Sequence, residues 1–443
     1  MRPCHRPGFF GPADCPGPGR SLETAHAALY PQKSAPVTPV SPYLNRYAIA
    51  LLTGGGIATL AVNLAPAAYY DAVEWQPLDL GALLGFGMFD PVLTPETLIS
   101  ALLMPVFFLL VGKELWEALV LKRGSLHGAR AIVPALLLVG AALGGMLAWS
   151  FISTAIETAE EASEARGWVL PFGTDIVLSY FFGRMIFGAG HPVLQVLLFL
   201  TVMDAVLALA AQGALTLLAG DLRPGWLALP LLAALTGYFT LTRPLHQLGL
   251  SEVSRQRADH VWPWVVLGAV SWIGICASGL PPALGLLPIL PVIPHGAHSF
   301  GLFSQAEGFL TDPLNRLAHL LLLPLVGVLF LFALSHGGLD FQALNPTTWA
   351  VLGAFWLGKP FGFLVTLALV RLTGLEVLRR LEGRNVLFVA GLMGIGAISP
   401  ILALEAALPG GAMQEGARLG LGLTLLAGPL LLLVHRATLS RQD

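Results

Sequence analysis

The sequence predicts an all-α, polytopic membrane protein with about twelve transmembrane helices, and two of its properties support that prediction. Of the 443 residues, 55% are hydrophobic and only 11% are charged, whereas a soluble domain carries about 25% charged residues. From Arg46 onward, long apolar runs alternate with short polar breaks. An apolar run of about 20 residues can cross the roughly 30 Å hydrocarbon core as a helix. The lipid bilayer is therefore the expected surrounding of this chain.

The apolar runs define twelve candidate spans. The seventh and eighth are short, because Pro281 and Pro282 separate two brief apolar stretches. The spans lie at 46–66, 96–121, 131–152, 168–187, 191–212, 225–241, 261–278, 280–294, 317–336, 346–370, 385–407 and 418–435.

Positive charges are distributed unevenly between the loops. Loops after odd-numbered spans carry only Arg166, Arg223 and Arg418, and the segment 157–167 is acidic. Because loops rich in Lys and Arg are retained on the cytoplasmic side, we expect the loops after even-numbered spans and both termini to lie in the cytoplasm. The protein itself is expected in the cell inner membrane. An even number of spans agrees with this orientation. The loops after even-numbered spans and the C-terminal tail contain Lys122, Arg123, Arg130, Arg184, Arg243, Arg255, Arg257, Arg316, Arg371, Arg379, Arg380, Arg384, Arg436 and Arg441.

Composition divides the chain into three parts. Residues 1–45 are rich in Pro and Gly and lack the apolar core of a signal peptide, so we expect a disordered cytoplasmic leader or a start codon assigned too early. Residues 46–436 form the predicted transmembrane domain, and 437–443 a short cytoplasmic tail. A net charge of −2 argues against a nucleic-acid partner. The three cysteines show no metal-ligand spacing, and no cofactor is expected.

The fourth span contains a carboxylate beside two helix-breaking residues. Pro171 and Gly173 precede Thr174 and Asp175 in WVLPFGTDIVLSYFFGR. Because Pro removes a backbone donor and Gly relaxes the helix, this span is expected to break near its middle. A broken span exposes half-helix ends that can face an ion. Asp175 would then either neutralise exposed helix N-termini or bind a cation, with Thr174 assisting.

The eleventh span is the second one that should not run straight. Its sequence GLMGIGAISP contains Gly391, Gly394, Gly396 and Pro400 within ten residues. Glycines at such spacing often only let two helices approach closely. Two interrupted spans, one in each half of the chain, point instead to a midplane binding site. For the pair together we favour the binding site.

Two further charges lie inside apolar runs. Asp204 lies in LLFLTVMDAVLALA and Lys359 in WLGKPFGF, where Pro360 disfavours a regular helix. A charge at the centre of a membrane helix costs about 2.5–3.5 kcal/mol, so Asp204 is expected to be protonated or paired. A pair between Lys359 and Asp204 is the economical solution. Proton binding there would compete with cation binding, which is the physical basis of antiport.

The second span carries three charges near its cytoplasmic end, in FFLLVGKELWEAL. Lys113 could simply extend its ammonium to the membrane interface. Alternatively, Glu114 and Glu117 line a cytoplasmic funnel and tune its proton or cation concentration. The sequence leaves both interpretations open.

Four segments, taken in their order along the chain, resemble segments of the NhaA-type sodium/proton antiporters. MPVFFLLVGKELWEAL resembles the family's second-span signature, GTDIVLSYFFGR its Thr-Asp broken helix, LGKPFGF its Gly-Lys-Pro segment and GLMGIGAISP its glycine-rich eleventh helix. The resemblance covers nearly all of 46–436. It implies inverted repeats with interrupted, crossing fourth and eleventh helices, and a homodimer. It also implies exchange of Na⁺ or Li⁺ for protons, in pH and sodium homeostasis.

The resemblance also implies roles for single residues. Thr174 and Asp175 match the broken-helix pair, and Lys359 matches the family's essential lysine. Asp204 matches the first residue of an aspartate pair in the fifth helix. With Asp175 and Thr174, it would form the cation and proton site. The backbone of the two interruptions is formed by Gly173, Gly394 and Gly396.

The chain departs from the family at the aspartate pair, because Ala205 follows Asp204. In one register, the family's principal cation ligand is missing and Asp204 is the partner of Lys359. In a register shifted by one, Asp204 is the ligand for Na⁺ or Li⁺ and the partner is missing. Either way one titratable carboxylate is lost, which places the family's usual exchange of two protons per sodium in question.

The sequence favours a secondary transporter over an enzyme. An alternative keeps the fold but gives a proton-linked carrier of another solute, or a transport-dead sensor or scaffold, and Ala205 motivates it. An intramembrane aspartyl protease is poorly supported, because Asp175 lacks a Gly-x-Gly-Asp segment and Asp204 lacks a Tyr-Asp context.

Overall fold

The computed structural model describes residues 40–76, 94–121, 131–156, 167–243, 260–295, 302–305, 312–373, 383–408 and 410–439. The chain divides into two compact units, Met1–Val37 and Thr38–Asp443, and every described residue belongs to the second. Positions 1–39 of the predicted leader lie outside the described residues.

The described residues are helical, apart from connections and an isolated antiparallel bridge between Val40 and Ser304. The first predicted span corresponds to α2 (Tyr43–Leu64), and the second to α5 (Pro95–Leu98), η1 (Ile99–Leu103) and α6 (Met104–Leu119). The third corresponds to α7 (Ile132–Ile156), the fourth to η3 (Gly167–Val169) and α9 (Ile176–Phe187), and the fifth to α10 (Pro192–Ala219). A short helix, α3 (Pro66–Val73), follows α2.

The sixth to twelfth predicted spans likewise correspond to helical segments. The sixth span contains η4 (Pro224–Leu227), α11 (Ala228–Gly237) and η5 (Tyr238–Thr242), the seventh is α14 (Trp262–Ser278), and the eighth contains η6 (Pro282–Leu284) and η7 (Leu287–Val292). The ninth contains α15 (Pro313–Leu322) and α16 (Pro324–His336), and the tenth contains α17 (Pro346–Gly353), η10 (Ala354–Gly358) and α18 (Lys359–Leu372). The eleventh contains α19 (Arg384–Leu392) and α20 (Ile398–Ala407), and the twelfth contains α21 (Ala412–Thr424) and α22 (Ala427–Leu439). A short η9 (Phe341–Ala343) precedes α17.

The helices confirm a polytopic membrane architecture. Seven helices in the described ranges are long and apolar enough to cross a membrane, or up to eight if α15 and α16, bent by 53°, count as one span. The other predicted spans are shorter or broken. The eighth, 280–294, forms only 3₁₀ turns, because Pro281, Pro282, Pro288 and Pro291 deprive it of backbone donors.

The fourth span is interrupted around Pro171 and Gly173, as these two helix-breaking residues predicted. The turn η3 ends at Val169, and α9 begins only at Ile176. Gly173 has a φ of +92°, a conformation that residues with a side chain rarely adopt. A Cβ atom there would also lie 2.8 Å from the Cβ of Ser399. Conformation and close packing therefore both require a glycine here.

The eleventh span is interrupted between α19, which ends at Leu392, and α20, which begins at Ile398. The backbone passes very close to η10 at this point. A Cβ atom on Gly394 would lie 2.8 Å from the carbonyl oxygen of Phe355, and one on Gly396 would overlap the Phe355 ring. The glycines of GLMGIGAISP therefore allow the interrupted backbone to pack against the tenth span.

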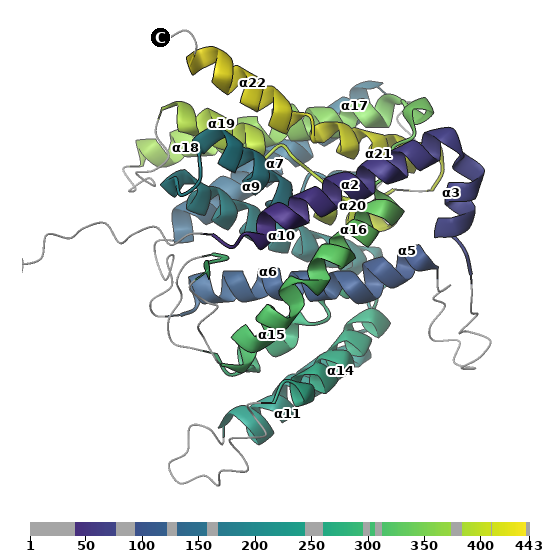
Figure 1. Cartoon of the computed structure of the whole chain (residues 1–443), viewed down its shortest axis with the longest axis vertical. Helices are drawn as coiled ribbons and strands as arrows, with labels where there is room; N and C mark the ends of the chain where they lie inside the picture. Colours follow the sequence, from purple (N-terminus) through teal and green to yellow (C-terminus); the bar gives the residue numbers. More distant parts are fainter. Residues whose placement is uncertain are drawn as a thin grey trace, which may run out of the picture. The chain divides into compact units, whose positions relative to one another are not determined.

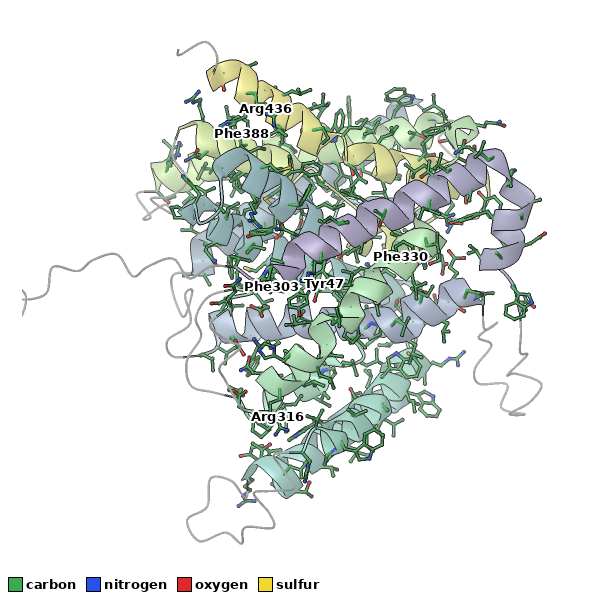
Figure 2. The ribbon with its side chains drawn as sticks, in the orientation of Figure 1. Tyr47, Phe303, Arg316, Phe330, Phe388 and Arg436 are labelled. Atoms are coloured by element: carbon green, nitrogen blue, oxygen red, sulfur yellow. The ribbon has the colours of Figure 1, made fainter. Side chains whose placement is uncertain are left out.

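Contacts between distant spans hold the second unit together. In Figure 1, α2 lies beside α16, and α11 lies beside α14. Tyr47 of α2 donates a hydrogen bond to the carbonyl oxygen of Leu322 at the end of α15, at 2.8 Å, and lies beside these helices in Figure 2. α7 packs along η10 and α18 through glycines on both sides, among them Gly144 and Gly362.

We predict that Gly144→Val lowers the thermal stability of the purified protein. A Cβ atom at Gly144 would lie 2.7 Å from the Cα of Gly362 and 2.9 Å from its backbone nitrogen. Overpacking of this kind typically costs about 1–3 kcal/mol. The measurement is the unfolding temperature in detergent.

Gly56→Val is the matched control, because Gly56 is exposed on α2 and a Cβ atom there would meet nothing within 4 Å. Equal unfolding temperatures for the two variants would show that the approach of α7 to α18 does not need glycine at position 144.

Candidate functional site

The interrupted fourth span, α10 and α18 bring three predicted site residues together. The ammonium Nζ of Lys359 lies 2.7 Å from Oδ2 of Asp204 and donates a hydrogen bond to the hydroxyl oxygen of Thr174 at 2.9 Å. The Thr174 hydroxyl lies 2.6 Å from the same carboxylate oxygen and 2.9 Å from the Met393 carbonyl oxygen. Lys359 and Asp204 are fully buried. The arrangement is a direct, buried ion pair in which the Thr174 hydroxyl contacts both charged groups.

One oxygen of the pair remains available for a ligand. In the described part of the chain, Oδ1 of Asp204 is buried and accepts no hydrogen bond. A carboxylate oxygen normally finds a partner when buried, because an unsatisfied acceptor costs about 1–3 kcal/mol or more. Oδ1 is therefore the oxygen at which a cation could bind without first displacing a protein donor.

Asp175 holds the N-termini of two half-helices. It is the N-cap of α9, where Oδ1 accepts a hydrogen bond from the Leu178 amide at 2.7 Å. Its Oδ2 faces the Ile398 amide at the start of α20, at 3.4 Å. Helix N-termini carry partial positive charge, so one carboxylate between two of them is favourable. This geometry matches the capping role considered for Asp175, and the cation-binding role remains a prediction.

Further hydrogen bonds join the interruptions of the fourth and eleventh spans. The Asp175 amide donates to the Ile395 carbonyl at 2.8 Å, and the Ser179 hydroxyl donates to the Leu392 carbonyl at 3.0 Å. Thr424, at the end of α21, contacts both the amide and the carbonyl of Gly396 at 3.0 Å. Protein partners thus satisfy these backbone groups at the two breaks, where the membrane interior offers no water.

The surroundings of Lys359 include an aromatic ring that our sequence reasoning did not identify. Nζ lies 5.1 Å from the centroid of the Phe355 ring. Phe355 belongs to the π-helical turn η10, which ends directly before Lys359. The helix is therefore irregular just before Pro360, which has no amide proton to donate. On another side, the stem of Lys359 packs on Gly145 of α7.

Ala205 occupies the buried position after Asp204 on α10. Of the two registers that the sequence allowed, the geometry matches the one in which Asp204 contacts Lys359. The second carboxylate of the family pattern is then the missing one. The assignment of Asp204 as a cation ligand stays a prediction.

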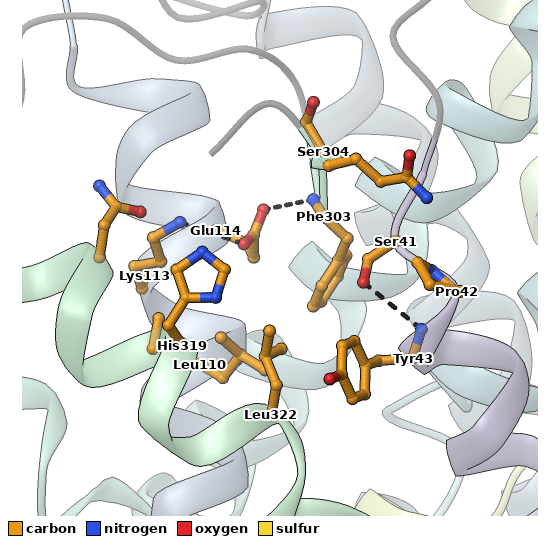
Figure 3. Close-up of a pocket in the computed structure, with 13 residues that line it drawn as sticks. Ser41, Pro42, Tyr43, Leu110, Lys113, Glu114, Phe303, Ser304, His319 and Leu322 are labelled. Atoms are coloured by element: carbon orange, nitrogen blue, oxygen red, sulfur yellow. Dashed lines mark hydrogen bonds and ion pairs between the residues drawn. The ribbon is translucent and has the colours of Figure 1, made fainter. Parts of the chain in front are cut away.

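The charges of the second span form a separate buried cluster. Lys113 is buried and lies 3.3 Å from both Glu114 and Glu117, so it does not extend into solvent. Glu114 also accepts a hydrogen bond from the Phe303 amide at 2.6 Å. Figure 3 shows this bond beside a cavity of about 280 Å³, which Lys113 and His319 also line. The structure thus places Glu114 at a cavity, whereas a funnel function for Glu114 and Glu117 remains a prediction.

Our sequence reasoning missed a further cluster of polar and charged side chains, because its members come from three distant spans. Glu96 of α5 lies 3.8 Å from His336 at the end of α16 and 3.8 Å from Arg418 of α21. Arg418 also pairs with Glu415 at 3.1 Å. No spacing of residues in the sequence predicts such a cluster. It joins the second, ninth and twelfth spans at one end of the bundle.

Within the described ranges, no group of three or more His, Cys, Asp or Glu side chains is arranged to hold a metal ion.

Comparisons with known proteins place the chain in a family. A model of the family described as Na⁺/H⁺ antiporter 1 matches residues 45–431. A protein named Na(+)/H(+) antiporter NhaA from Jannaschia sp. (strain CCS1) is 33% identical over 408 residues, covering 89% of this chain and 97% of that protein. A protein of the same name from Geobacter sulfurreducens is 28% identical over 391 residues, covering 87% of this chain and 93% of that protein. The match of the family model to most of the chain shows that this protein belongs to the Na⁺/H⁺ antiporter 1 family.

Proposed function

We propose that this protein exchanges Na⁺ or Li⁺ for protons across a cell inner membrane and contributes to pH and sodium homeostasis. The single observation that supports this most is the buried pair of Lys359 and Asp204 at the interrupted spans. Relatives covering nearly the same length are named Na⁺/H⁺ antiporters. The excess of Lys and Arg in alternate loops supports cytoplasmic N- and C-termini. A homodimer rests on family resemblance alone.

Competition at Asp204 supplies the coupling. When Lys359 is protonated, its ammonium occupies Oδ2 of Asp204 at 2.7 Å. When Lys359 releases its proton, Asp204 is left as an uncompensated buried charge, which is costly unless a cation replaces the ammonium. The metal ion and the proton therefore compete, because both together would leave a net positive charge at the buried site.

The cation site itself would be built from oxygen atoms. Asp204 offers the unpartnered Oδ1, and the Thr174 hydroxyl and the Met393 carbonyl oxygen lie next to it. Hard cations prefer such carboxylate, hydroxyl and carbonyl ligands. Asp175 would act beside this site by neutralising the two half-helix N-termini that its carboxylate faces.

The charge of the site favours exchange of one proton per cation. The proton-loaded pair contains Asp204 as carboxylate and Lys359 as ammonium, with no net charge. The cation-loaded site contains the carboxylate, the metal ion and a neutral amine, again with no net charge. A second carboxylate would need a further proton, but position 205 is alanine. Ala205 also motivated the alternatives of a proton-linked carrier of another solute, or a transport-dead sensor or scaffold. The family match and the names of the relatives favour Na⁺/H⁺ exchange over both.

We predict that Asp204→Asn abolishes cation-dependent collapse of a pH gradient in proteoliposomes. The amide keeps the shape of the side chain but loses the charge for which cation and ammonium compete. A pH-sensitive dye reports exchange, and isothermal titration with Na⁺ and Li⁺ should lose its binding heat. Asp221→Asn, at an exposed carboxylate after α10, is the matched control and should behave as wild type. Persistent exchange by Asp204→Asn would contradict the assignment.

We further predict that wild-type exchange does not depend on membrane potential, and that Ala205→Asp makes it potential-dependent. One net charge crossing the field exchanges about 2.3 kcal/mol per 100 mV, so an imposed potential separates the two stoichiometries. Initial rates would be compared with and without a potassium diffusion potential. Potential-dependent exchange by the wild type would refute the one-to-one stoichiometry. Sodium exchange found only in Ala205→Asp would instead support another solute or a scaffold role.

A further inference from the structure

Thr424 holds the turn of backbone that interrupts the eleventh span. The threonine is fully buried at the end of α21, and its hydroxyl oxygen lies 3.0 Å from both the amide nitrogen and the carbonyl oxygen of Gly396. The amide donates to this hydroxyl, whose single proton faces the carbonyl oxygens of Gly396 and Leu421. A side chain of the twelfth span therefore satisfies backbone groups that the break in the eleventh span releases.

The turn held by Thr424 carries backbone groups of the candidate cation site. The Met393 carbonyl oxygen accepts a hydrogen bond from the Thr174 hydroxyl at 2.9 Å. The Ile395 carbonyl oxygen accepts a hydrogen bond from the Asp175 amide at 2.8 Å. A movement of this turn would therefore change the position of the Met393 carbonyl oxygen relative to the carboxylate and hydroxyl oxygens of the site.

Thr424 differs from the other side chains that bind this turn. Within the described ranges, the side chains that hydrogen-bond to the backbone of 393–398 are those of Thr174, Asp175 and Thr424. The first two belong to the interrupted fourth span, whereas Thr424 ties the turn to the twelfth. The indole of Trp356, in η10, donates to the Thr424 carbonyl oxygen at 3.4 Å. The turn is therefore anchored outside the fourth span as well.

We propose that Thr424 is a positioning residue for the cation site, which holds the Met393 carbonyl oxygen where Na⁺ or Li⁺ needs it. This inference rests on the proposed exchange at Asp204. Groups that orient a ligand without being ligands themselves typically change metal affinity by about ten- to hundredfold. Thr424 acts through the backbone of the turn, because its hydroxyl is engaged by Gly396 and Leu421.

The test removes the hydroxyl and keeps the shape of the side chain. Thr424→Val replaces the hydroxyl by a methyl group, and Thr424→Ala is a second variant without the hydroxyl in case the first folds poorly. Thr424→Ser keeps the hydroxyl. Thr348→Val is the matched control, because the Thr348 hydroxyl is also fully buried and donates to a carbonyl of the same helix, that of Gly416, at 2.8 Å.

Two measurements separate the turn from the cation. Hydrogen–deuterium exchange without Na⁺ or Li⁺ reports on the turn, and Thr424→Val should exchange faster in peptides that span 391–401. The Na⁺ concentration for half-maximal transport in proteoliposomes reports on the site. It should rise about tenfold in Thr424→Val, with the maximal rate retained. A purely structural defect would instead lower the maximal rate, because it reduces the folded fraction. Thr424→Ser and Thr348→Val should keep both wild-type values.

If wild type transports Na⁺, an unchanged half-maximal Na⁺ concentration in folded Thr424→Val and Thr424→Ala would overturn the proposal. An equal rise in Thr424→Ser or in Thr348→Val would also overturn it, because the loss of this hydroxyl would then not be the cause. In both cases the exchange function stands and the role of Thr424 fails. If wild type transports no Na⁺ while Thr424→Val still speeds hydrogen–deuterium exchange of the turn, the exchange function fails and the hold of Thr424 on the turn stands.

Discussion

A single buried ion pair constrains the centre of this protein. Lys359 and Asp204 are fully buried, and their charged atoms lie 2.7 Å apart. Removing two charges from water costs several kcal/mol per ion, which their mutual attraction offsets only with good geometry and additional hydrogen bonds. Uninterrupted membrane helices cannot provide those bonds from their backbone, because their amides and carbonyls are already paired. The polar partners must therefore come from side chains or from places where helices break.

The breaks of the fourth and eleventh spans meet this requirement, and they create a requirement of their own. The interrupted backbone places the Thr174 hydroxyl against both charges and the Met393 carbonyl beside it. It also exposes two half-helix N-termini, and Asp175 compensates for both with a single carboxylate. The hydroxyls of Ser179 and Thr424 satisfy further backbone groups. The ion pair therefore depends on the breaks for polar partners, and the breaks depend on Asp175 and on these hydroxyls.

The sequence predicts those parts of this arrangement that have local causes. Proline and glycine disrupt a helix where they occur, so both interruptions could be predicted from Gly173 and Gly394 with their neighbours. Charges within apolar runs must be compensated, which predicted a partner for Asp204. The ring of Phe355 could not be predicted, because a phenylalanine in an apolar span looks like any core residue until its orientation is known. The cluster around Glu96 could not be predicted either, since it joins three spans distant in sequence.

The same electrostatics explain why exchange at this site would be tightly coupled. A site holding the ammonium and a site holding a metal ion are both neutral, so either can be enclosed by protein at little electrostatic cost. A site that has lost the proton without gaining a cation leaves Asp204 as an unpaired charge, which is expensive away from water. Alanine at position 205 keeps this balance simple, because a carboxylate there would add another buried negative charge beside the pair. The penalty on the empty, deprotonated site would keep either substrate from crossing alone.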